Sequence, residues 1–252
     1  MALARKVLWI VNMNTESTEK AFGKHALACD ANIVCIRTSS SRLPDAIKRF
    51  HDLNMKVYAW RWPQVVPSKL QAEADKVANN LIPAGLDGYI VDPESDGPGN
   101  NDWNQNGLDQ RAKSFCDTIK QAAAGKPFVF GTTSGCAYPA ATGKPKIPWA
   151  QFFAASDVLL PQTYGRWTKN DGSVGNINGG TPKKAFARGL AAWQPKAMGK
   201  PIIPMAGEVD VIKVSEIADY GTRLQAMGVD EGHFYTDNGK IPVANLAAIK
   251  AL

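Results

Sequence analysis

Two carboxylates stand two residues apart in an apolar segment, and this pair is well suited to acid chemistry. Asp92 and Glu94 follow an apolar run in the segment 86–95. Alternate side chains of a β-strand point to one face, so Ile90, Asp92 and Glu94 would share a face, with the carboxyl groups about 7 Å apart. Two acids this close repel each other when both are ionised, and one of them holds its proton to a higher pH.

A protonated carboxyl group beside an ionised one is what cleavage of a glycosidic bond requires. The acid protonates the leaving oxygen, and the negative charge stabilises the positive sugar of the transition state. The structural alternative is a solvated strand end, or an ion pair with Arg37 or Arg61. A position at the end of a strand favours the functional interpretation, provided that the strand belongs to a barrel whose sites lie at strand ends.

The elements that would position this pair alternate regularly along the chain. Apolar residues at steps of three and four, such as Leu70, Ala74, Val77 and Leu81, predict helices with one apolar stripe. Between the helical segments lie β-rich runs that are apolar almost throughout, as expected for parallel strands covered on both faces. Eight such runs predict strands at 7–13, 33–38, 56–62, 87–94, 127–133, 158–164, 201–209 and 232–237.

Eight strand–helix units in 252 residues predict one domain, a single (β/α)8 TIM barrel of residues 1–252. An open doubly wound sheet is the alternative, but no GxGxxG motif follows the first strand. The strand-to-helix loops 95–104, 134–147 and 165–181 are long, and in a barrel they lie on the face that carries active sites. Aromatic residues in these loops would either stack on a sugar or form a lid over the barrel mouth; they are Trp103, Tyr138 and Trp167.

The segment Asp87-Gly88-Tyr89-Ile90-Val91-Asp92-Pro93-Glu94 resembles the DGxDxDxE strand of family 18 glycoside hydrolases, the chitinases and endo-acting N-acetylglucosaminidases. The resemblance implies that Glu94 is the general acid. It implies that Asp92 orients the substrate's acetamido group, whose carbonyl oxygen acts as the nucleophile. The sixth strand, which ends in Gln162-Thr163-Tyr164, is also similar to that of the family. Tyr164 would then help to hold the acetamido group, with Gln162 pointing inward beside it.

The chain departs from the family pattern at two places. Ile90 stands where the family has a middle Asp that partners the next one, and the segment 58–62 replaces the family's SxGG motif. The acidic pair also resembles family 25 lysozymes, which cleave peptidoglycan, but Asn12 and Asn14 stand on the first strand where that family has an Asp. The chain is identified as a divergent member of a glycosidase-like barrel group.

Other residues at the predicted strand ends are further candidates for substrate binding. Glu208 ends the seventh strand, where it would be either a nucleophile paired with Glu94 in a two-carboxylate retaining mechanism or an arginine partner. Tyr235 and Asp237 on the eighth strand are expected to line the mouth. Trp60 and Trp62 share a face of the third strand; they would floor a sugar subsite if inward, or pack beneath helices if outward.

Composition narrows the class of partner. The net charge of +6 is spread over scattered Lys and Arg, which favours a polyanionic partner such as a cell-wall polymer. No nucleic-acid recognition motif and no apolar run of membrane-spanning length are present, so neither partner is expected. Three histidines, two of them in helical segments, predict no metal site, and no cofactor is expected. The four cysteines show no CxxC spacing, which predicts buried, reduced thiols.

The sequence therefore predicts a glycosidase that cleaves β-linked N-acetylhexosamine polymers, either chitin-like or the peptidoglycan glycan. Its partner would be a polysaccharide or oligosaccharide, and the protein would be a monomer. A sugar-binding barrel without catalysis, of the lectin or inhibitor type, is the alternative from another class. The apolar stretch 7–11 is too short for a signal peptide, which predicts synthesis in the cytoplasm; an enzyme that acts on the cell wall would then need another route of release.

Overall fold

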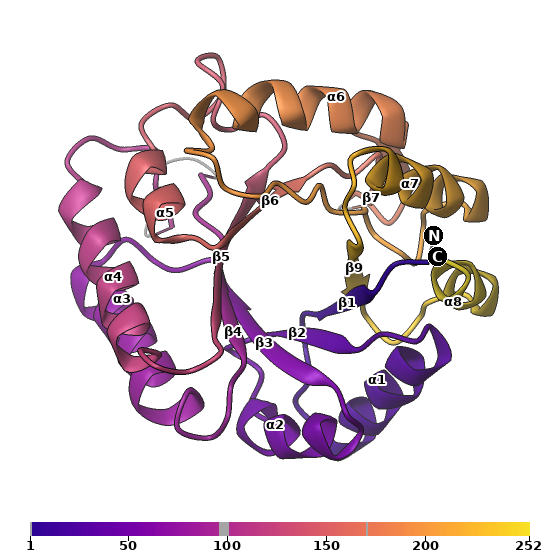
Figure 1. Cartoon of the computed structure of the whole chain (residues 1–252), viewed down its shortest axis with the longest axis horizontal. Coiled ribbons are helices and arrows are strands. Elements are labelled where there is room, and N and C mark those ends of the chain that lie inside the picture. The colour runs from indigo at the N-terminus through magenta and orange to yellow at the C-terminus, as the bar shows by residue number, and fades with distance from the viewer. Residues whose placement is uncertain (1, 96–100, 170) are drawn as a thin grey trace.

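A closed ring of strands inside a ring of helices forms the protein, in a computed structural model that describes residues 2–95, 101–169 and 171–252 (Figure 1). In these residues one parallel sheet runs in the order β6-β5-β4-β3-β2-β1-β9. The predicted (β/α)8 barrel is confirmed. The strands of the ring are β1 (Arg5–Ile10), β2 (Ile33–Arg37), β3 (Lys56–Arg61), β4 (Gly88–Val91), β5 (Val129–Gly135), β6 (Val158–Gln162) and β9 (Glu231–Asp237).

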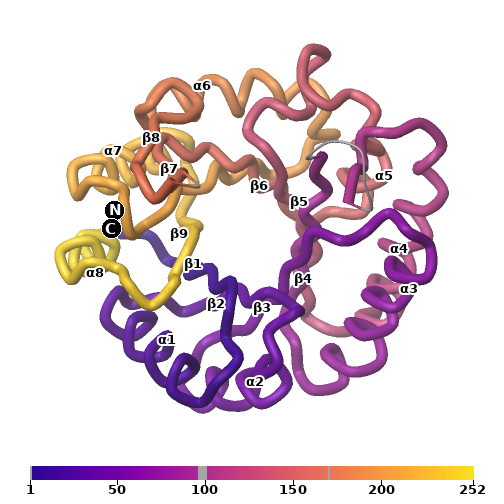
Figure 2. Tube along the Cα trace, turned by 180° about the vertical axis from the view of Figure 1, so that it is seen from behind, coloured from indigo at the N-terminus to yellow at the C-terminus, as the bar shows by residue number. Residues whose placement is uncertain are grey.

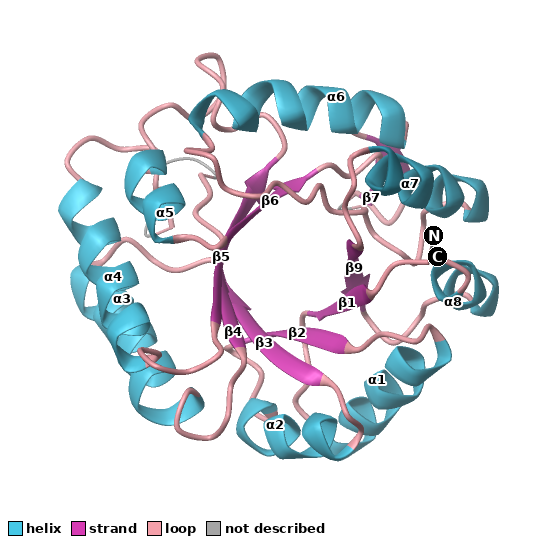
Figure 3. Cartoon of the chain, viewed as in Figure 1, coloured by secondary structure: helices cyan, strands magenta, loops and turns pink. Residues whose placement is uncertain are grey.

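The helices cover the outer face of the strands, as Figure 3 shows. Their apolar stripes face the sheet, and left-handed backbone ends several of them, as at Gly125 (φ 76°) and Gly228 (φ 71°), where glycine has no Cβ to clash. They are α1 (Glu16–Ala28), α2 (Leu43–Asp52), α3 (Pro67–Lys76) with the π-helical turn η1 (Val77–Leu81), α4 (Asp109–Ala122), α5 (Trp149–Ala155), α6 (Pro182–Trp193) with the 3-10 turn η2 (Gln194–Lys196), α7 (Val214–Ala226) and α8 (Val243–Lys250).

The segment 201–206 closes the barrel between β6 and β9. Isolated parallel bridges join Leu159 to Ile202 and Ala206 to Phe234, and the N–H of Met205 donates to the Pro161 carbonyl (2.9 Å). Pro204 has no N–H to donate, which interrupts the ladder. The predicted strand 201–209 is therefore in its expected place, but as bridged extended backbone instead of a continuous strand.

The predicted loop 165–181 contains a small antiparallel hairpin, which the local sequence pattern does not indicate. Its strands are β7 (Arg166–Thr168) and β8 (Val174–Asn176). Arg166 Nε donates to Glu216 of α7 at 2.8 Å, an ion pair that fixes the base of the hairpin against the helical ring. The predicted loop 95–104 includes residues 96–100, which lie outside the described part of the chain.

A column of polar side chains runs through the barrel interior below the mouth. Trp9 Nε1 donates to His233 Nδ1 (3.1 Å), His233 Nε2 contacts Glu231 Oε1 (2.8 Å), and Arg5 Nε donates to Glu231 Oε2 (2.5 Å). Because Nδ1 accepts from Trp9, the imidazole proton is assigned to Nε2, which donates to Glu231. Burial opposes ionisation of Glu231, but the hydrogen bonds from His233 and Arg5 outweigh it and lower the pKa of Glu231 to about 2.

The chain ends meet beside this column at the other mouth. Seen from behind, N and C lie side by side (Figure 2), and the N–H of Leu3 donates to the carbonyl of Leu252. The four cysteines are buried free thiols, as predicted. No helix in the described residues has the length and apolarity to cross a bilayer.

Candidate active site

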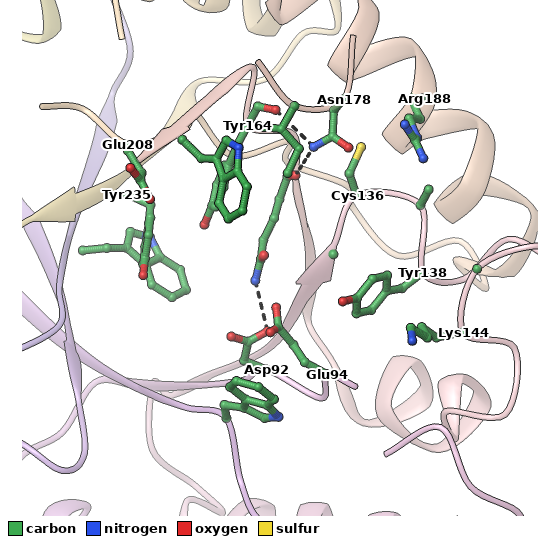
Figure 4. A pocket seen from close by; sticks show the side chains of 18 of the residues that line it. Asp92, Glu94, Cys136, Tyr138, Lys144, Tyr164, Asn178, Arg188, Glu208 and Tyr235 are labelled. Atoms are coloured by element: carbon green, nitrogen blue, oxygen red, sulfur yellow. Dashed lines mark hydrogen bonds between the residues drawn. The ribbon is translucent and has the colours of Figure 1, made fainter. Parts of the chain in front are cut away.

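A cavity of about 790 Å³ opens at the C-terminal ends of the barrel strands (Figure 4). This is the end of a (β/α)8 barrel at which enzymes of this fold carry their sites. Aromatic, acidic and basic side chains share its wall. The aromatic ones are Trp9, Trp60, Trp62, Tyr138, Tyr164, Trp167 and Tyr235, the acidic ones Asp92, Glu94 and Glu208, and the basic ones Arg37, Lys144 and Arg188.

Asp92 and Glu94 extend from β4 into this cavity. Ile90 pairs with Trp60 on one side and Gly131 on the other, and Gly131, having no Cβ, leaves room for the Ile90 side chain. Strand alternation then turns Asp92 and Glu94 inward as well. The backbone beyond the strand is held on both sides, because Asp92 N–H donates to the Arg61 carbonyl and Ser134 Oγ donates to the Pro93 carbonyl.

The two carboxyl groups form one unit. A side-chain hydrogen bond joins Asp92 to Glu94, and Gln162 Nε2 donates to Asp92 Oδ1 at 3.1 Å (Figure 4). Asp92 is only 6% exposed, whereas Glu94 is partly open to the cavity. Burial raises the pKa of Asp92 well above its usual value, and the charge and hydrogen bond of Glu94 raise it further, against the opposing Gln162 contact. These effects favour one proton shared by the pair over two ionised carboxylates.

Neither structural alternative for the acidic pair, a solvated strand end or an ion pair with Arg37 or Arg61, is found in the structure. A solvated strand end would leave Asp92 exposed, and it is buried. Arg37 Nη2 instead donates to Asn12 Oδ1 (2.8 Å), and within the described ranges neither Arg37 nor Arg61 forms an ion pair with an acid. The predicted acidic pair thus lies at the cavity, and the ion pair with Arg37 or Arg61 that would explain it structurally is not formed among those residues.

Tyr164 and Tyr235 stack on each other across the cavity wall, with ring centroids 5.3 Å apart and an interplanar angle of 11°. Asn178 Nδ2 donates to the Tyr164 carbonyl (3.1 Å), and Gly207 approaches Tyr164 so closely that a Cβ there would lie 3.1 Å from Tyr164 Cβ. Burial raises the pKa of both phenols, and the charges of neighbouring groups, including Asp92 and Glu94, add to it. Both hydroxyls consequently keep their protons and can donate hydrogen bonds.

The inward interpretation of Trp60 and Trp62 is the one that the structure shows. Trp60 lies beneath the cavity, 5.7 Å from Trp9 and 6.2 Å from Tyr235 between ring centroids, and its Nε1 donates to the Ile10 carbonyl. Trp62 is partly exposed at the rim, and its Nε1 donates to the Asn101 carbonyl (3.1 Å). Trp60 and Trp9 give the cavity an aromatic floor and Trp62 an aromatic rim, which suits the apolar face of a sugar ring.

Glu208 and Trp167 meet the cavity from the hairpin side. Trp167, in β7, is 40% exposed and lines the opening. Glu208 Oε2 accepts a hydrogen bond of 2.6 Å from the N–H of Thr168, so this acid ties the hairpin to the end of the seventh barrel segment. In Figure 4 Glu208 lies near Tyr235, on the opposite flank from Lys144.

Two residues predicted for the site are placed elsewhere. Trp103 is fully buried, packs edge-on against Phe152 (5.1 Å) and donates from Nε1 to the Pro63 carbonyl (2.8 Å). Its loop turns back toward the sheet, because the N–H of Trp103 donates to the Glu94 carbonyl. Trp103 is therefore a core residue and neither a sugar platform nor a lid.

Asp237 is the second correction. Its buried carboxylate contacts His25 Nδ1 of α1 at 2.8 Å and accepts from the N–H of Gly239. Simple alternation would place Asp237 beside Tyr235, but the register of β9 against β1 shifts at Leu8 and Ile10. The irregularity turns Asp237 away from the cavity, toward α1.

Several residues that line the cavity were not predicted as site residues from the sequence. Trp9 lies near the end of β1, Lys144 and Asn178 lie in two different loops, and Arg188 lies in α6; none of these segments carries a motif. Lys144 lies in one of the long loops facing the mouth, which is the single signal that could have found it. No group of three or more His, Cys, Asp or Glu in the described residues is arranged to hold a metal ion.

The closed parallel barrel and the acidic, aromatic-lined cavity at its strand ends define a chitinase-like (β/α)8 fold, and solved structures agree. A chitinase from Chromobacterium violaceum superposes with a TM-score of 0.65 at 11% identity, over 98% of both chains. A GH18 chitinase from Pseudoalteromonas aurantia gives 0.62 at 12% identity, also over 98% of both chains.

The spore cortex-lytic enzyme SleL of Bacillus cereus gives a TM-score of 0.68 at 8% identity, over 97% of this chain and 73% of that one. These neighbours are glycosidases, and at such identities the likeness establishes the fold. Neither a protein-family model nor a curated protein sequence matches this chain.

Proposed function

We propose that the protein hydrolyses β-linked N-acetylhexosamine glycans, with Glu94 as the general acid and Asp92 and Tyr164 orienting the substrate's acetamido group. The observation that carries the proposal is the hydrogen-bonded Asp92–Glu94 pair, whose burial and mutual charge favour retention of a proton and which faces the cavity that Tyr164 also lines. Barrels of this fold carry many chemistries, so the proposal depends on this site and not on the fold alone.

The two acids take different roles because their environments differ. Glu94, the more exposed of the two, delivers the proton of the pair to the glycosidic oxygen as the bond from C1 to that oxygen breaks. The acetamido carbonyl oxygen forms the new bond to C1. Water then attacks C1 as the bond from C1 to the acetamido oxygen breaks, which regenerates the acetamido group, and the water loses a proton to the Glu94 carboxylate, which restores the pair.

Asp92, Gln162 and Tyr164 position the acetamido group. Gln162 makes the contact with Asp92 that Ile90 cannot make, since Ile90 stands where related enzymes have a second Asp. Asp92 is thereby held in place to accept from the acetamido N–H. Tyr164, protonated because its pKa is raised, donates from its hydroxyl to the acetamido carbonyl.

A two-carboxylate mechanism that uses Glu94 and Glu208 is the second candidate. Glu208 lines the same cavity, which is the observation in its favour. Its hydrogen bond with Thr168 instead supports the role of holding the hairpin. A non-catalytic sugar-binding barrel is the third, and it predicts binding without turnover.

The test compares the wild type with Glu94→Gln and Glu208→Gln on chito-oligosaccharides and on peptidoglycan fragments. Glu94→Gln should lower kcat by about 10²- to 10⁴-fold, because the glutamine amide cannot deliver a proton, while the melting temperature shows that the variant is folded. Glu208→Gln should retain most of the activity. A thiazoline that imitates the cyclised acetamido intermediate should inhibit the wild type.

Each alternative gives a different result in the same assay. Loss of activity in both variants, with indifference to the thiazoline, would replace the acetamido mechanism by the Glu94–Glu208 pair. Full activity in Glu94→Gln would contradict the assignment of the acid. Binding of the sugars by wild type and Glu94→Gln alike, with no turnover by either, would establish the lectin-like alternative.

A further inference from the structure

One wall of the cavity is cationic. Lys144, from the loop after β5, and Arg188, from α6, line it together with Tyr138, and these three residues are called the cationic wall below. Lys144 Nζ lies 5.9 Å from the centroid of the Tyr138 ring. Figure 4 shows the three residues on one flank, Glu208 and Tyr235 on the opposite flank, and Asp92 and Glu94 between them.

These two cations have no acidic partner in the described part of the chain. Ion pairs there neutralise other basic residues, such as Arg166 with Glu216 and Lys113 with Asp117, but none includes Lys144 or Arg188. No side-chain hydrogen bond to protein is found for either within the same ranges. The Lys144 ammonium and the Arg188 guanidinium therefore border the cavity with N–H donors that remain available to a ligand.

The cationic wall borders the acidic pair on one flank of the cavity, as Figure 4 shows. Arg37, the remaining cation of the cavity, donates to Asn12 and lies near Tyr235. Lys144 and Arg188 come from the opposite side, where Arg188 approaches Cys136 and Tyr138 follows that cysteine by two residues. A glycan that places its reacting sugar over Asp92 and Glu94 would extend a neighbouring group toward this wall.

We propose that this cationic wall binds carboxylates on the glycan, so that the substrate is an acidic N-acetylhexosamine polymer and not a neutral one. The inference rests on the proposed function, whose substrate class it narrows. Arginine and lysine bind carboxylates through charge-assisted hydrogen bonds, and the Tyr138 face supplies a surface for the sugar that bears them. A neutral polymer would leave the cations without a partner.

The test compares a variant that lacks the two cations of the cationic wall with a variant that loses the same charge elsewhere on the protein. The wall variant is Lys144→Ala with Arg188→Ala. The matched control is Lys146→Ala with Lys183→Ala, which are exposed residues of the same loop and the same helix that do not line this cavity. Both variants lower the net charge by two, so a general attraction of a basic protein for a polyanion affects them equally.

The probes differ only in charge. One is a tetrasaccharide of alternating N-acetylglucosamine and N-acetylmuramic acid with free lactyl carboxylates, and the other is the same compound with those carboxylates amidated. Kd is measured by calorimetry with each variant in the Glu94→Gln background, and KM with Glu94 intact. Calorimetry reports on the wall even where no bond is cleaved, so failure of this inference and failure of the hydrolase proposal are distinguished.

The expected result is a preference of about tenfold for the free acid over the amide in the parent protein, the size expected for two charge contacts at a partly exposed wall. This ratio should fall close to one in the wall variant and persist in the matched control. It should also decline as salt is raised from about 50 mM to about 500 mM, because ions screen exposed charges.

Three outcomes would overturn the inference: equal Kd for the acid and the amide in the parent protein, an unchanged ratio in the wall variant, or the same loss of the ratio in the matched control. Absence of cleavage with the ratio intact would contradict the hydrolase proposal and leave a receptor for acidic glycans. Cleavage of both probes with no charge preference would support the hydrolase and refute the wall.

Discussion

At the scale of single residues, the site combines burial with charge at a cost in stability. Asp92 lies in a nearly closed environment, where ionisation is unfavourable because water is excluded and Glu94 is adjacent. Gln162 offsets only part of this effect. A buried acid with a strongly raised pKa is typical of a functional site, because an apolar or neutral side chain would stabilise the core more at the same position.

Asp92→Asn should therefore stabilise the protein at neutral pH while it impairs turnover. A raised native pKa means that the stability contributed by Asp92 is complete below the unfolded pKa near 3.8 and is lost as the pH rises through the native pKa. The asparagine does not titrate, so the variant should exceed the wild type by about 1–2 kcal/mol at pH 7, and the gap should close toward pH 3.8.

Urea unfolding at a series of pH values measures this difference. Asp52→Asn, at an exposed acid on α2, serves as the control and should change stability by less than about 0.5 kcal/mol. A wild type that is more stable than Asp92→Asn at pH 7 would show that the ionised form is favoured in the fold.

At the scale of elements, β9 connects the cavity floor with the far end of the barrel. Its inner face presents Glu231, His233 and Tyr235 at alternate positions. His233 Nδ1 accepts a hydrogen bond from the Trp9 indole N–H, and His233 Nε2 donates one to Glu231. Arg5 forms an ion pair with Glu231 at the far end of the barrel. One strand thus orients both Tyr235 of the aromatic wall and Trp9 of the floor.

Glu231→Gln should weaken the fold in a pH-dependent way. The native pKa of Glu231, about 2, is below its unfolded value, so its stability is present above about pH 4.5 and is lost as the pH falls toward 2. The variant should lose about 2–4 kcal/mol at pH 7, because Arg5 and His233 lose their partner, and the deficit should shrink below pH 4.5.

Denaturant unfolding at pH 7, 4 and 3 follows this loss. Asp230→Asn is the neighbouring control, since Asp230 also pairs with Arg5 (3.1 Å) but its side chain is 59% exposed, and it should change stability by less than about 1 kcal/mol. Equal effects of the two substitutions at pH 7 would argue against the buried column as a stabilising unit.

At the scale of the whole molecule, the barrel is closed by the segment 201–206, which is not a continuous strand. Pro201 and Pro204 cannot donate to the ladder, but the N–H groups of Ile203, Met205 and Ala206 do donate to carbonyls of the neighbouring strands. Side-chain packing adds to these bonds: Met205 is fully buried and its sulfur accepts from Thr133 Oγ1 across the interior. Closure therefore comes from both the interrupted ladder and the core.

Met205→Ala should destabilise the protein by about 2–5 kcal/mol, because it removes packing at the closing seam and leaves a cavity. The amide hydrogens of Ile203, Met205 and Ala206 should then exchange faster than those of β3 and β4. Met198→Ala is the matched control, a methionine that is 62% exposed after η2, with an expected change below about 0.5 kcal/mol. Uniform acceleration across all strands would instead mean that the seam opens only with global unfolding.

The alternation of elements and the position of the acidic pair could be predicted from the sequence. Both depend on local periodicity: Ile90, Asp92 and Glu94 share a face in any strand, and apolar steps of three and four define helices in any fold. For the same reason Gln162 and Tyr164 were expected on one face, and the structure brings both to the cavity.

Only the tertiary structure decided which faces turn inward and which distant residues meet. Trp60 could not be placed from alternation alone, Asp237 was turned away by a shift of register, and Trp103 was drawn into the core by its loop. Lys144 and Arg188 come together from a loop and a helix. Such placements arise from contacts between segments far apart in the chain, which local patterns do not encode.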